Sequence, residues 1–243
     1  MKELLNTVIQ GDCMEYMKTI PDKYFELAIC DPPYGLNAAK FSNCFGLGLG
    51  YTPVSLKLLI GKKGSGKLKD RIINTADCTW DKKPPSKEYF IELFRVSKNQ
   101  IIWGGNYFGL PPTRCFVIWD KEQSFLNFSA CEYAWTSFDF PSKIFRYSNR
   151  GFLCKEKDKI HPTQKPVALY AYLLDEFAKQ GDKILDTHLG SGSSRIAAYM
   201  KGFDFYGIEI DKGYFDLQEK RFKSVCLNQY CFKNITLIQK TIF

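Results

Sequence analysis

The chain has 243 residues, of which 45% are hydrophobic and 25% are charged. These values fit a globular domain and exclude a disordered chain, a collagen and a coiled coil. Lys and Arg outnumber Asp and Glu by 34 to 26, and the net charge of +8 fits a polyanionic partner and a plain basic protein about equally well. No apolar run is long enough to span a bilayer and no secretory signal pattern opens the sequence, so we expect a cytoplasmic protein that does not bind membranes.

Cysteine and histidine usage argues against a disulfide scaffold and against a metal site. The sequence has nine cysteines, an odd number, with no C-x-x-C pair, and its two histidines are His161 and His188. This spacing matches no zinc-binding pattern. We therefore expect no metal, and cysteines that are small buried residues or free thiols in a reducing cytoplasm.

The first part of the chain predicts two strands and a short helix, followed by irregular sequence. Strand 7–10 ends at Gly11-Asp12, and helix 14–20 ends at Pro21. Strand 26–30 ends at Asp31-Pro32-Pro33-Tyr34, because proline cannot donate to a strand ladder. Residues 36–80 are rich in glycine and lysine and are expected to form a basic irregular insertion.

The rest of the chain alternates between helices and strands. This alternation predicts a single α/β domain over 1–243, with a mostly parallel, doubly wound sheet and helices on both faces. Residues 120–160 are a candidate target-recognition region, of which 138–160 are expected to be a loop or hairpin rich in Lys and Arg. The expected elements are helix 86–96, strands 100–103, 115–119 and 131–137, helix 166–179, strand 183–186, helix 193–201 and strand 204–210.

Two motifs could carry chemistry, and the first follows the predicted strand 183–186. That strand ends in Asp186, and the turn Gly190-Ser191-Gly192 leads into a helix. Glu209 stands about twenty residues later, at the end of the next strand, where an acid accepts hydrogen bonds from ribose hydroxyls. The pattern favours a nucleoside cofactor over NAD or FAD, because no third glycine brings a pyrophosphate onto the helix. A tight strand–helix turn without a ligand is the structural alternative.

The second motif is Asp31-Pro32-Pro33-Tyr34, directly after a buried strand. Prolines have no N–H group, so the carbonyl groups here are open to hydrogen bonds from a ligand. A carboxylate, bare carbonyls and an aromatic ring make a pocket for a planar group that bears an amine. Considered alone, the motif favours a rigid turn, with Tyr34 packed on the core.

Together these motifs resemble the S-adenosylmethionine-dependent DNA amino-methyltransferases of the N6-adenine and N4-cytosine group. Residues 31–34 look like the group's catalytic motif, and 186–192 look like its cofactor motif, usually Asp-Pro-Phe-x-Gly-Ser-Gly, with Thr187 and His188 in place of Pro-Phe. The segment 161–166, His-Pro-Thr-Gln-Lys-Pro, resembles a third motif of the group. The order, with the catalytic motif first, is that of the β class, and the resemblance is best over 7–37 and 100–221.

The resemblance implies a Rossmann-like methyltransferase domain that uses S-adenosylmethionine and acts on double-stranded DNA, with a flipped-out target base. Asp31 and the Pro32 carbonyl would accept the amine N–H groups, and Tyr34 would stack on the base. Asp at the first position favours adenine. A homodimer and a counterpart restriction endonuclease are further expectations. The residues expected on the cofactor side are Asp186, Gly190, Ser191, Gly192, Glu209, Asp12, His161, Thr163 and Lys165.

The segment 61–68 nearly matches a phosphate-binding loop of nucleotide hydrolases, but Leu68 replaces the hydroxyl residue that would bind magnesium. We therefore expect a basic loop in which Lys62, Lys63 and Lys67 contact DNA phosphates, with a solvated insertion as the alternative. An N4-cytosine enzyme, an RNA methyltransferase and a catalytically idle nucleic-acid-binding module are the alternative functions. The intact Asp31 and Glu209 argue against an idle module.

Overall fold

The computed structural model describes residues 5–36, 83–122, 129–148 and 159–227. The chain divides into two compact units, Met1–Pro32 together with Pro85–Phe243, and Pro33–Pro84. In the second unit the described ends lie against each other, since a Cβ atom on Gly35 would be 2.6 Å from Cδ of Pro84. The predicted basic insertion, with Lys62, Lys63 and Lys67, lies outside the described residues apart from residue 36.

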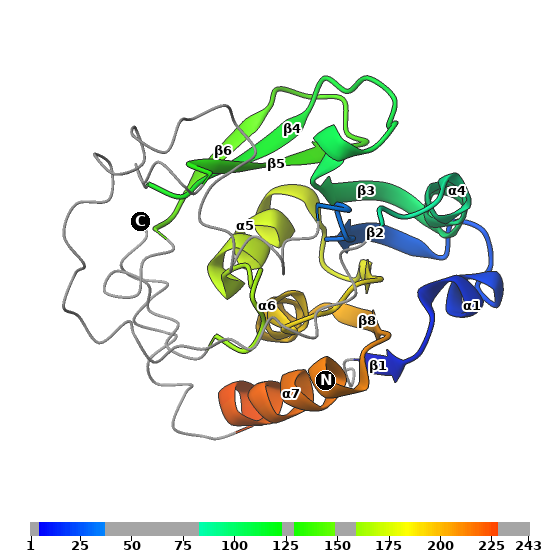
Figure 1. The fold of residues 1–243 in the computed structure, drawn as a ribbon, viewed down its shortest axis with the longest axis vertical. Coiled ribbons are helices and arrows are strands. Elements are labelled where there is room, and N and C mark those ends of the chain that lie inside the picture. Colours follow the sequence, from blue (N-terminus) through cyan, green and yellow to red (C-terminus); the bar gives the residue numbers. More distant parts are fainter. Residues whose placement is uncertain (1–4, 37–82, 123–128, 149–158, 228–243) are drawn as a thin grey trace, which may run out of the picture. The chain divides into compact units, whose positions relative to one another are not determined.

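The first unit contains an eight-stranded sheet with the order β1-β8-β7-β2-β3-β5-β4-β6 (Figure 1). All the paired strands described run parallel except β5, which is antiparallel to both β3 and β4. This confirms the predicted mostly parallel α/β fold. The strands are β1 Asn6–Gln10, β2 Phe25–Cys30, β3 Ser97–Trp103, β4 Phe116–Asp120, β5 Cys131–Thr136, β6 Lys143–Arg146, β7 Lys183–Asp186 and β8 Asp204–Glu209.

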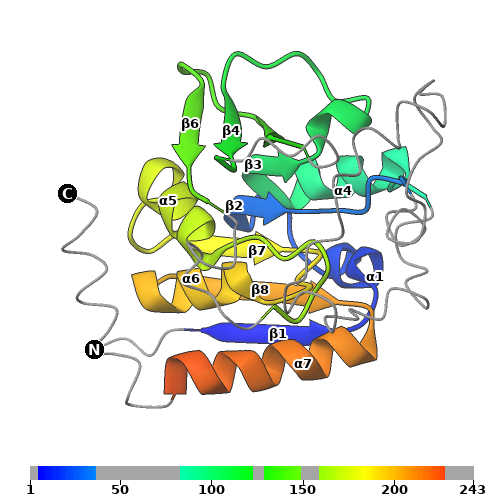
Figure 2. The same ribbon diagram turned by 60° about the vertical axis from the view of Figure 1, so that its left-hand side comes forward.

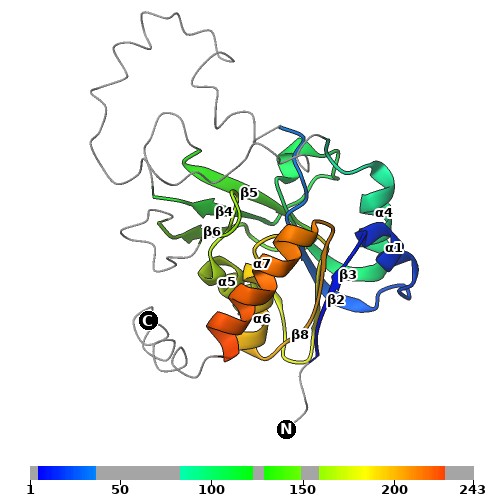
Figure 3. The ribbon, with the colours of Figure 1, turned by 60° about the horizontal axis from the view of Figure 1, so that its bottom comes forward.

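Helices cover both faces of the sheet. Helices α1 and α4 lie on one face, while α5, α6 and α7 lie on the other (Figures 2 and 3). The helices are α1 Cys13–Lys18, α4 Lys87–Val96, α5 Val167–Phe177, α6 Ser193–Lys201 and α7 Lys212–Phe222, with a 3₁₀ turn η3 at Gly105–Tyr107 and a π-helical turn η4 at Lys223–Leu227. Among the described residues, no helix is long and apolar enough to cross a membrane.

Strand β2 shows why the sheet needs both layers. Its side chains alternate, so that Leu27 and Ile29 join the core beneath α5 and α6, while Ala28 and Cys30 join the core beneath α1 and α4. All four residues are buried. A run of apolar residues without polar alternation is therefore the pattern of a central parallel strand, as the sequence suggested.

Two elements differ from the sequence-based expectation. Residues 138–160 were expected to be a loop or hairpin, but Lys143–Arg146 form β6, which pairs in parallel with β4. Its side chains alternate between intermediate and exposed, so no apolar run marked it as a strand. Helix α7 was not predicted, although Asp211 caps its first turn by accepting a hydrogen bond from the backbone N–H of Tyr214.

Candidate active site

The carboxyl ends of four neighbouring parallel strands form the edge at which the site is built. Gln10 at the end of β1 pairs with Glu209 at the end of β8, and Asp186 at the end of β7 pairs with Gly207. Strand β2, which ends just before Asp31, pairs with β7. Strands β2 and β7 are neighbours in the sheet, but the chain continues from them in opposite directions: from β2 to β3 on one side, and from β7 to β8 on the other. A topological switch point therefore falls between β2 and β7. Ligands of doubly wound sheets bind at such points.

Asp31 is bound by a buried lysine from the loop before α5. The ammonium of Lys165 donates to Oδ2 of Asp31 and to Oε2 of Glu132, the second contact at 3.1 Å. Lys165 is 3% exposed and the Asp31 side chain 17%. Burial disfavours the charged lysine, but the two carboxylates outweigh it and raise the pKa of Lys165. Lys165 thus contacts the predicted catalytic aspartate, and its contact with the cofactor stays a prediction.

Asp186 holds the turn after β7 together. One carboxylate oxygen accepts from the backbone N–H of His188 at 3.0 Å and the other from the hydroxyl of Ser194 at 2.5 Å. The residue is 1% exposed, and burial raises the pKa of its carboxyl group to about 7. These two hydrogen bonds give Asp186 a structural role, because they fix the conformation of the turn. A direct contact of Asp186 with a cofactor stays a prediction.

The turn Gly190–Gly192 depends on left-handed backbone. Gly190 has φ +51° and Gly192 has φ +71°, values that residues with a Cβ atom rarely adopt. A Cβ atom on Gly192 would also lie 3.1 Å from Oε1 of Gln218 in α7. Arg221, also in α7, donates to the carbonyl of Ser191 at 2.8 Å and to the hydroxyl of Ser193 at 2.9 Å. Helix α7 therefore supports the glycine turn from beneath.

Glu209 ends β8 facing this turn. Its Oε2 accepts from the backbone N–H of Gly190 at 2.7 Å, and its Oε1 accepts from that of Asp211 at 2.9 Å. Burial raises the pKa of Glu209 above its ordinary value, although these hydrogen bonds favour the charged form. The structure therefore brings Glu209 and Gly190 into contact, and the binding of ribose by Glu209 stays a prediction.

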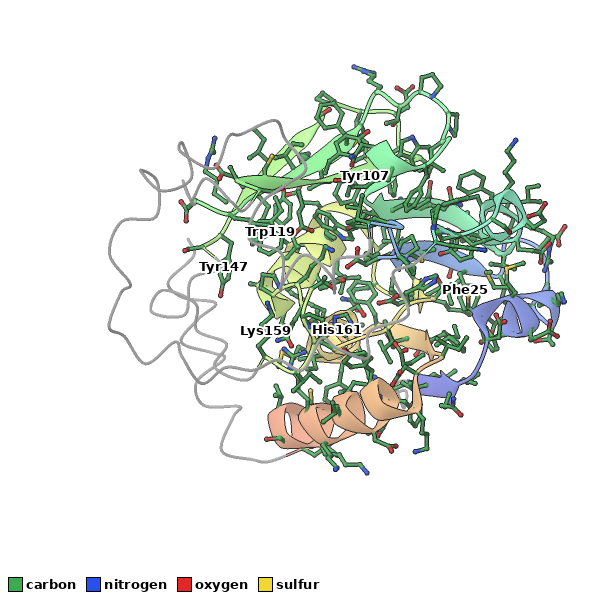
Figure 4. All side chains as sticks on the ribbon, in the orientation of Figure 1. Phe25, Tyr107, Trp119, Tyr147, Lys159 and His161 are labelled. Atoms are coloured by element: carbon green, nitrogen blue, oxygen red, sulfur yellow. The ribbon has the colours of Figure 1, made fainter. Side chains whose placement is uncertain are left out.

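The other residues expected on the cofactor side lie in different surroundings. Asp12, at the exposed end of β1, caps α1 by accepting from the backbone N–H of Met14 at 2.7 Å. The ring of His161, which is labelled in Figure 4, packs on Tyr214 with 4.3 Å between ring centres. A Cβ atom on Gly190 would lie 3.7 Å from the His161 ring, so this histidine borders the glycine turn. Thr163 is exposed, and its hydroxyl is 3.1 Å from Nδ1 of His161.

A hydrogen-bonded chain replaces the Pro-Phe pair of the family pattern. The hydroxyl groups of Tyr89 and Thr187 are 2.6 Å apart, and the Thr187 hydroxyl is 2.9 Å from Nδ1 of His188. The rings of Tyr89 and His188 meet edge to face. Burial lowers the pKa of His188 to about 4, so the imidazole is neutral at pH 7.

The predicted catalytic tetrapeptide spans the boundary between the two units. Asp31 and the buried Pro32 belong to the first unit, whereas Pro33 and Tyr34 belong to the second. The stacking role expected of Tyr34 stays a prediction. Among the described residues, no group of three or more His, Cys, Asp and Glu side chains could hold a metal ion.

Sequence reasoning missed three residues that the structure places around the site: Glu132, Tyr89 and Arg221. Glu132 is in β5, in the region considered for target recognition, and no local pattern links it to the loop before α5. Tyr89 lies on the buried side of α4, where a tyrosine looks like any core residue. Arg221 lies in α7, a helix that the sequence did not predict, and its burial is visible only in the structure.

Comparisons with known proteins show that the chain is similar to DNA methyltransferases. A model of the N6/N4 methyltransferase family, described as DNA methylase, matches residues 135–220. The Type II methyltransferase M.HinfI of Haemophilus influenzae is 26% identical over 93% of this chain and 70% of its own length. M2.DpnII of Streptococcus pneumoniae, another Type II methyltransferase, is 26% identical over 63% of this chain and 52% of its own length. The chain is a relative of the S-adenosylmethionine-dependent DNA amino-methyltransferases.

Solved structures of DNA methyltransferases have the same fold as this chain. The M1.HpyAVI–SAM complex has a TM-score of 0.52 and 17% identity, covering 88% of this chain and 98% of that chain. A putative DNA modification methylase of Thermus thermophilus, in complex with S-adenosyl-L-methionine, has a TM-score of 0.51 and 18% identity, covering 90% and 95%. The cytosine-N4-specific PvuII DNA methyltransferase has a TM-score of 0.55 and 15% identity, covering 88% of this chain and 85% of that chain. The Rossmann-like methyltransferase fold expected from the sequence is thus confirmed.

Proposed function

We propose that this chain transfers a methyl group from S-adenosylmethionine to the N6 amine of adenine in double-stranded DNA. The observation that carries the proposal is the position of Asp31. Its carboxylate follows β2 at the switch point, and the neighbouring strand β7 leads into the glycine turn that Glu209 contacts. An acceptor for an amine and a turn suited to a nucleoside cofactor therefore share one edge of the sheet.

The residues of the turn suit S-adenosylmethionine. A carboxylate offers about four acceptor positions, and the backbone N–H groups of Gly190, Asp211 and Ile210 use three of them. The remaining position suits a ribose hydroxyl of the cofactor. The backbone at Gly190 lets a ligand approach closely beside the His161 ring. When bound, the cofactor supplies an electrophilic methyl group, so the protein needs no covalent intermediate.

The remaining task of the protein is to make an exocyclic amine nucleophilic. The lone pair of such an amine is delocalised into the base ring. We assign the Asp31 carboxylate and the Pro32 carbonyl to accept its two N–H bonds, which favours a tetrahedral nitrogen with an exposed lone pair. Asp31 also stabilises the positive charge that develops on this nitrogen. A duplex hides the amine, so the base is flipped out of the stack, and Tyr34 would stack on it.

Adenine is the proposed base because Asp, rather than Ser, opens the tetrapeptide 31–34. Cytosine N4 is the alternative, and the fold alone does not separate the two, since the fold is shared with the cytosine-N4-specific PvuII enzyme. A homodimer and a counterpart restriction endonuclease stay predictions.

Methyl transfer to DNA tests the proposal directly. Purified protein is incubated with unmethylated plasmid DNA and radiolabelled S-adenosylmethionine, and the DNA is then digested to nucleosides. Label in N6-methyladenine is expected. Label in N4-methylcytosine would support the proposed mechanism but show that the target base is cytosine instead of adenine. Binding of the cofactor and of DNA without any transfer would identify the idle nucleic-acid-binding module.

A further inference from the structure

Lys165 is buried to an unusual degree for a lysine. A lysine near the start of a helix normally extends its ammonium into water. Here the side chain is 3% exposed, and its ammonium lies between Oδ2 of Asp31 and Oε2 of Glu132, 5.1 Å from the centre of the Trp103 ring. Taking an ammonium out of water costs several kcal/mol unless partners compensate for it. The two carboxylates and the indole ring are these partners.

Glu132 is held in turn by a second cation. Its Oε1 is 2.5 Å from the ammonium of Lys121, which follows β4. Four charged groups therefore form a chain in the order Lys121, Glu132, Lys165, Asp31, with two positive and two negative charges. Burial would raise the pKa of Glu132, but Lys165 and Lys121 outweigh it, and the pKa is lowered.

The chain of charges has two effects on Asp31. A carboxylate bound by an ammonium through one oxygen cannot rotate freely about its Cβ–Cγ bond, so its orientation is fixed before a substrate arrives. The same ammonium is shared with Glu132, so it does not neutralise Asp31 as completely as a lysine paired with Asp31 alone. Asp31 thus keeps negative charge for the amine while its geometry is set.

We propose that Lys165 and Glu132 are positioning residues for methyl transfer: Lys165 orients the carboxylate of Asp31, and Glu132 holds Lys165. The inference rests on the proposed function, in which Asp31 accepts the target amine. It assigns Lys165 to the substrate side of the reaction and not to the cofactor.

Steady-state kinetics of the full chain separate these two assignments. Lys165→Met keeps the length and apolar character of the side chain and removes its charge. We expect kcat to fall by roughly 10–100-fold, the scale for residues that orient a reacting group, while KM for S-adenosylmethionine stays within about two-fold. Lys165→Arg should recover part of kcat. Lys201→Met is the matched control, because it removes a lysine paired with Asp175 on the surface of the unit.

Glu132→Gln provides the second arm and remains informative if Lys165→Met does not fold. It should lower kcat, again without a change in the KM for cofactor. The double variant Lys165→Met/Glu132→Gln should be no slower than Lys165→Met, because both residues act through one contact. Additive losses would contradict the proposed chain.

Two further outcomes would overturn the inference. A raised KM for S-adenosylmethionine with unchanged kcat in Lys165→Met would make Lys165 a cofactor ligand, and unchanged kcat and KM would make the charges purely structural. Wild-type protein that transfers no methyl group to DNA would instead overturn the proposed function, and with it the role of Asp31.

Discussion

Glu209 accepts a hydrogen bond from the backbone N–H of Gly190 at 2.7 Å, so the end of β8 is tied to the glycine turn after β7. Its other oxygen is tied to the backbone N–H of Asp211. One carboxylate thus fixes the start of α7 and the turn that we assign to the cofactor. Changes at Glu209 should therefore affect both stability and cofactor binding.

Glu209→Ala should weaken the binding of S-adenosylmethionine by about 1–3 kcal/mol, because hydrogen-bonding groups of the ribose lose their acceptor. Isothermal titration calorimetry measures this. Asp204→Ala is the matched control: Asp204 begins the same strand and accepts from the backbone N–H of Leu5, at the end of β8 remote from the turn. Both variants should melt at lower temperature, but the Asp204 variant should bind the cofactor normally. An unchanged dissociation constant in Glu209→Ala would show that Glu209 does not bind the cofactor.

Asp31→Ala should slow methyl transfer by about 10²–10³-fold or more, because an acceptor matched to the developing positive charge is lost. Asp31→Asn keeps the shape and one acceptor but not the charge, so it should be slow without being inactive. Cofactor affinity should stay close to the wild-type value in both. Asp175→Ala, which removes an exposed carboxylate paired with Lys201, controls for general effects of losing an acid. Near-normal turnover in Asp31→Ala would show that Asp31 is not catalytic and that residues 31–34 only form a rigid turn.

The pH dependence of stability should reveal the buried His188. Burial lowers the pKa of His188 from 6.5 to about 4, so the unfolded chain binds this proton more readily. The stabilisation is present above the unfolded pKa and is lost as the pH falls from 6.5 towards 4, by up to about 1.4 kcal/mol per pH unit. Asp186, whose pKa is raised from 3.8 to about 7, acts in the opposite direction in the same window.

His188→Phe removes the histidine contribution and keeps the Asp186 contribution. The free energy of unfolding of this variant, measured with urea at about pH 7 and about pH 5, should fall less on acidification than that of the wild type, or should rise. The comparison within each protein cancels the loss of the contact with Thr187. An identical pH dependence in the two proteins would show that His188 does not differ between the folded and unfolded states.

Gly192→Ala should destabilise the protein more than Gly181→Ala. Both glycines have positive φ, +71° and +95° respectively, so both variants carry the strain of a left-handed residue, about 1–2 kcal/mol. A Cβ atom on Gly181 meets nothing within 4 Å, whereas one on Gly192 meets Gln218 at 3.1 Å. The difference between the two melting temperatures measures the packing of α7 against the turn. Equal shifts would mean that Gln218 gives way without cost.

The role expected of the basic loop 61–68 is tested by the salt dependence of DNA binding. Replacing Lys62, Lys63 and Lys67 with Ala should flatten the slope of log affinity against log salt by up to about 3 if all three contact phosphates. Fluorescence anisotropy with a labelled duplex over a range of salt concentrations gives the slope. An unchanged slope would favour the solvated insertion.

The sequence predicted most of the sheet because its central strands are short apolar runs that end in Asp or at Gly and Pro. The position of Glu209 and the glycine turn at one edge of the sheet followed from the rule that parallel strands bring their carboxyl ends together, but the hydrogen bond between them was not predicted. Strand β6 and helix α7 were not predicted from the sequence, because neither has a continuous apolar pattern.

The surroundings of Asp31 could not be predicted from the sequence. Lys165 is 134 residues further along the chain, and Glu132 lies in a third element. A lysine beside Pro166 looks the same in sequence whether it points into water or into the protein. Only the folded arrangement of β5 and the loop before α5 shows that two acids surround it.

Strands β2 and β3 are neighbours in the sheet, although the second unit, Pro33–Pro84, lies between them in the sequence. Leu27 pairs directly with Asn99, although the chain leaves the first unit after Pro32 and returns at Pro85. We expect residues 37–82 to be exchangeable between related enzymes as a module, with Asp31 after β2 and the turn after β7 unaltered in the recipient.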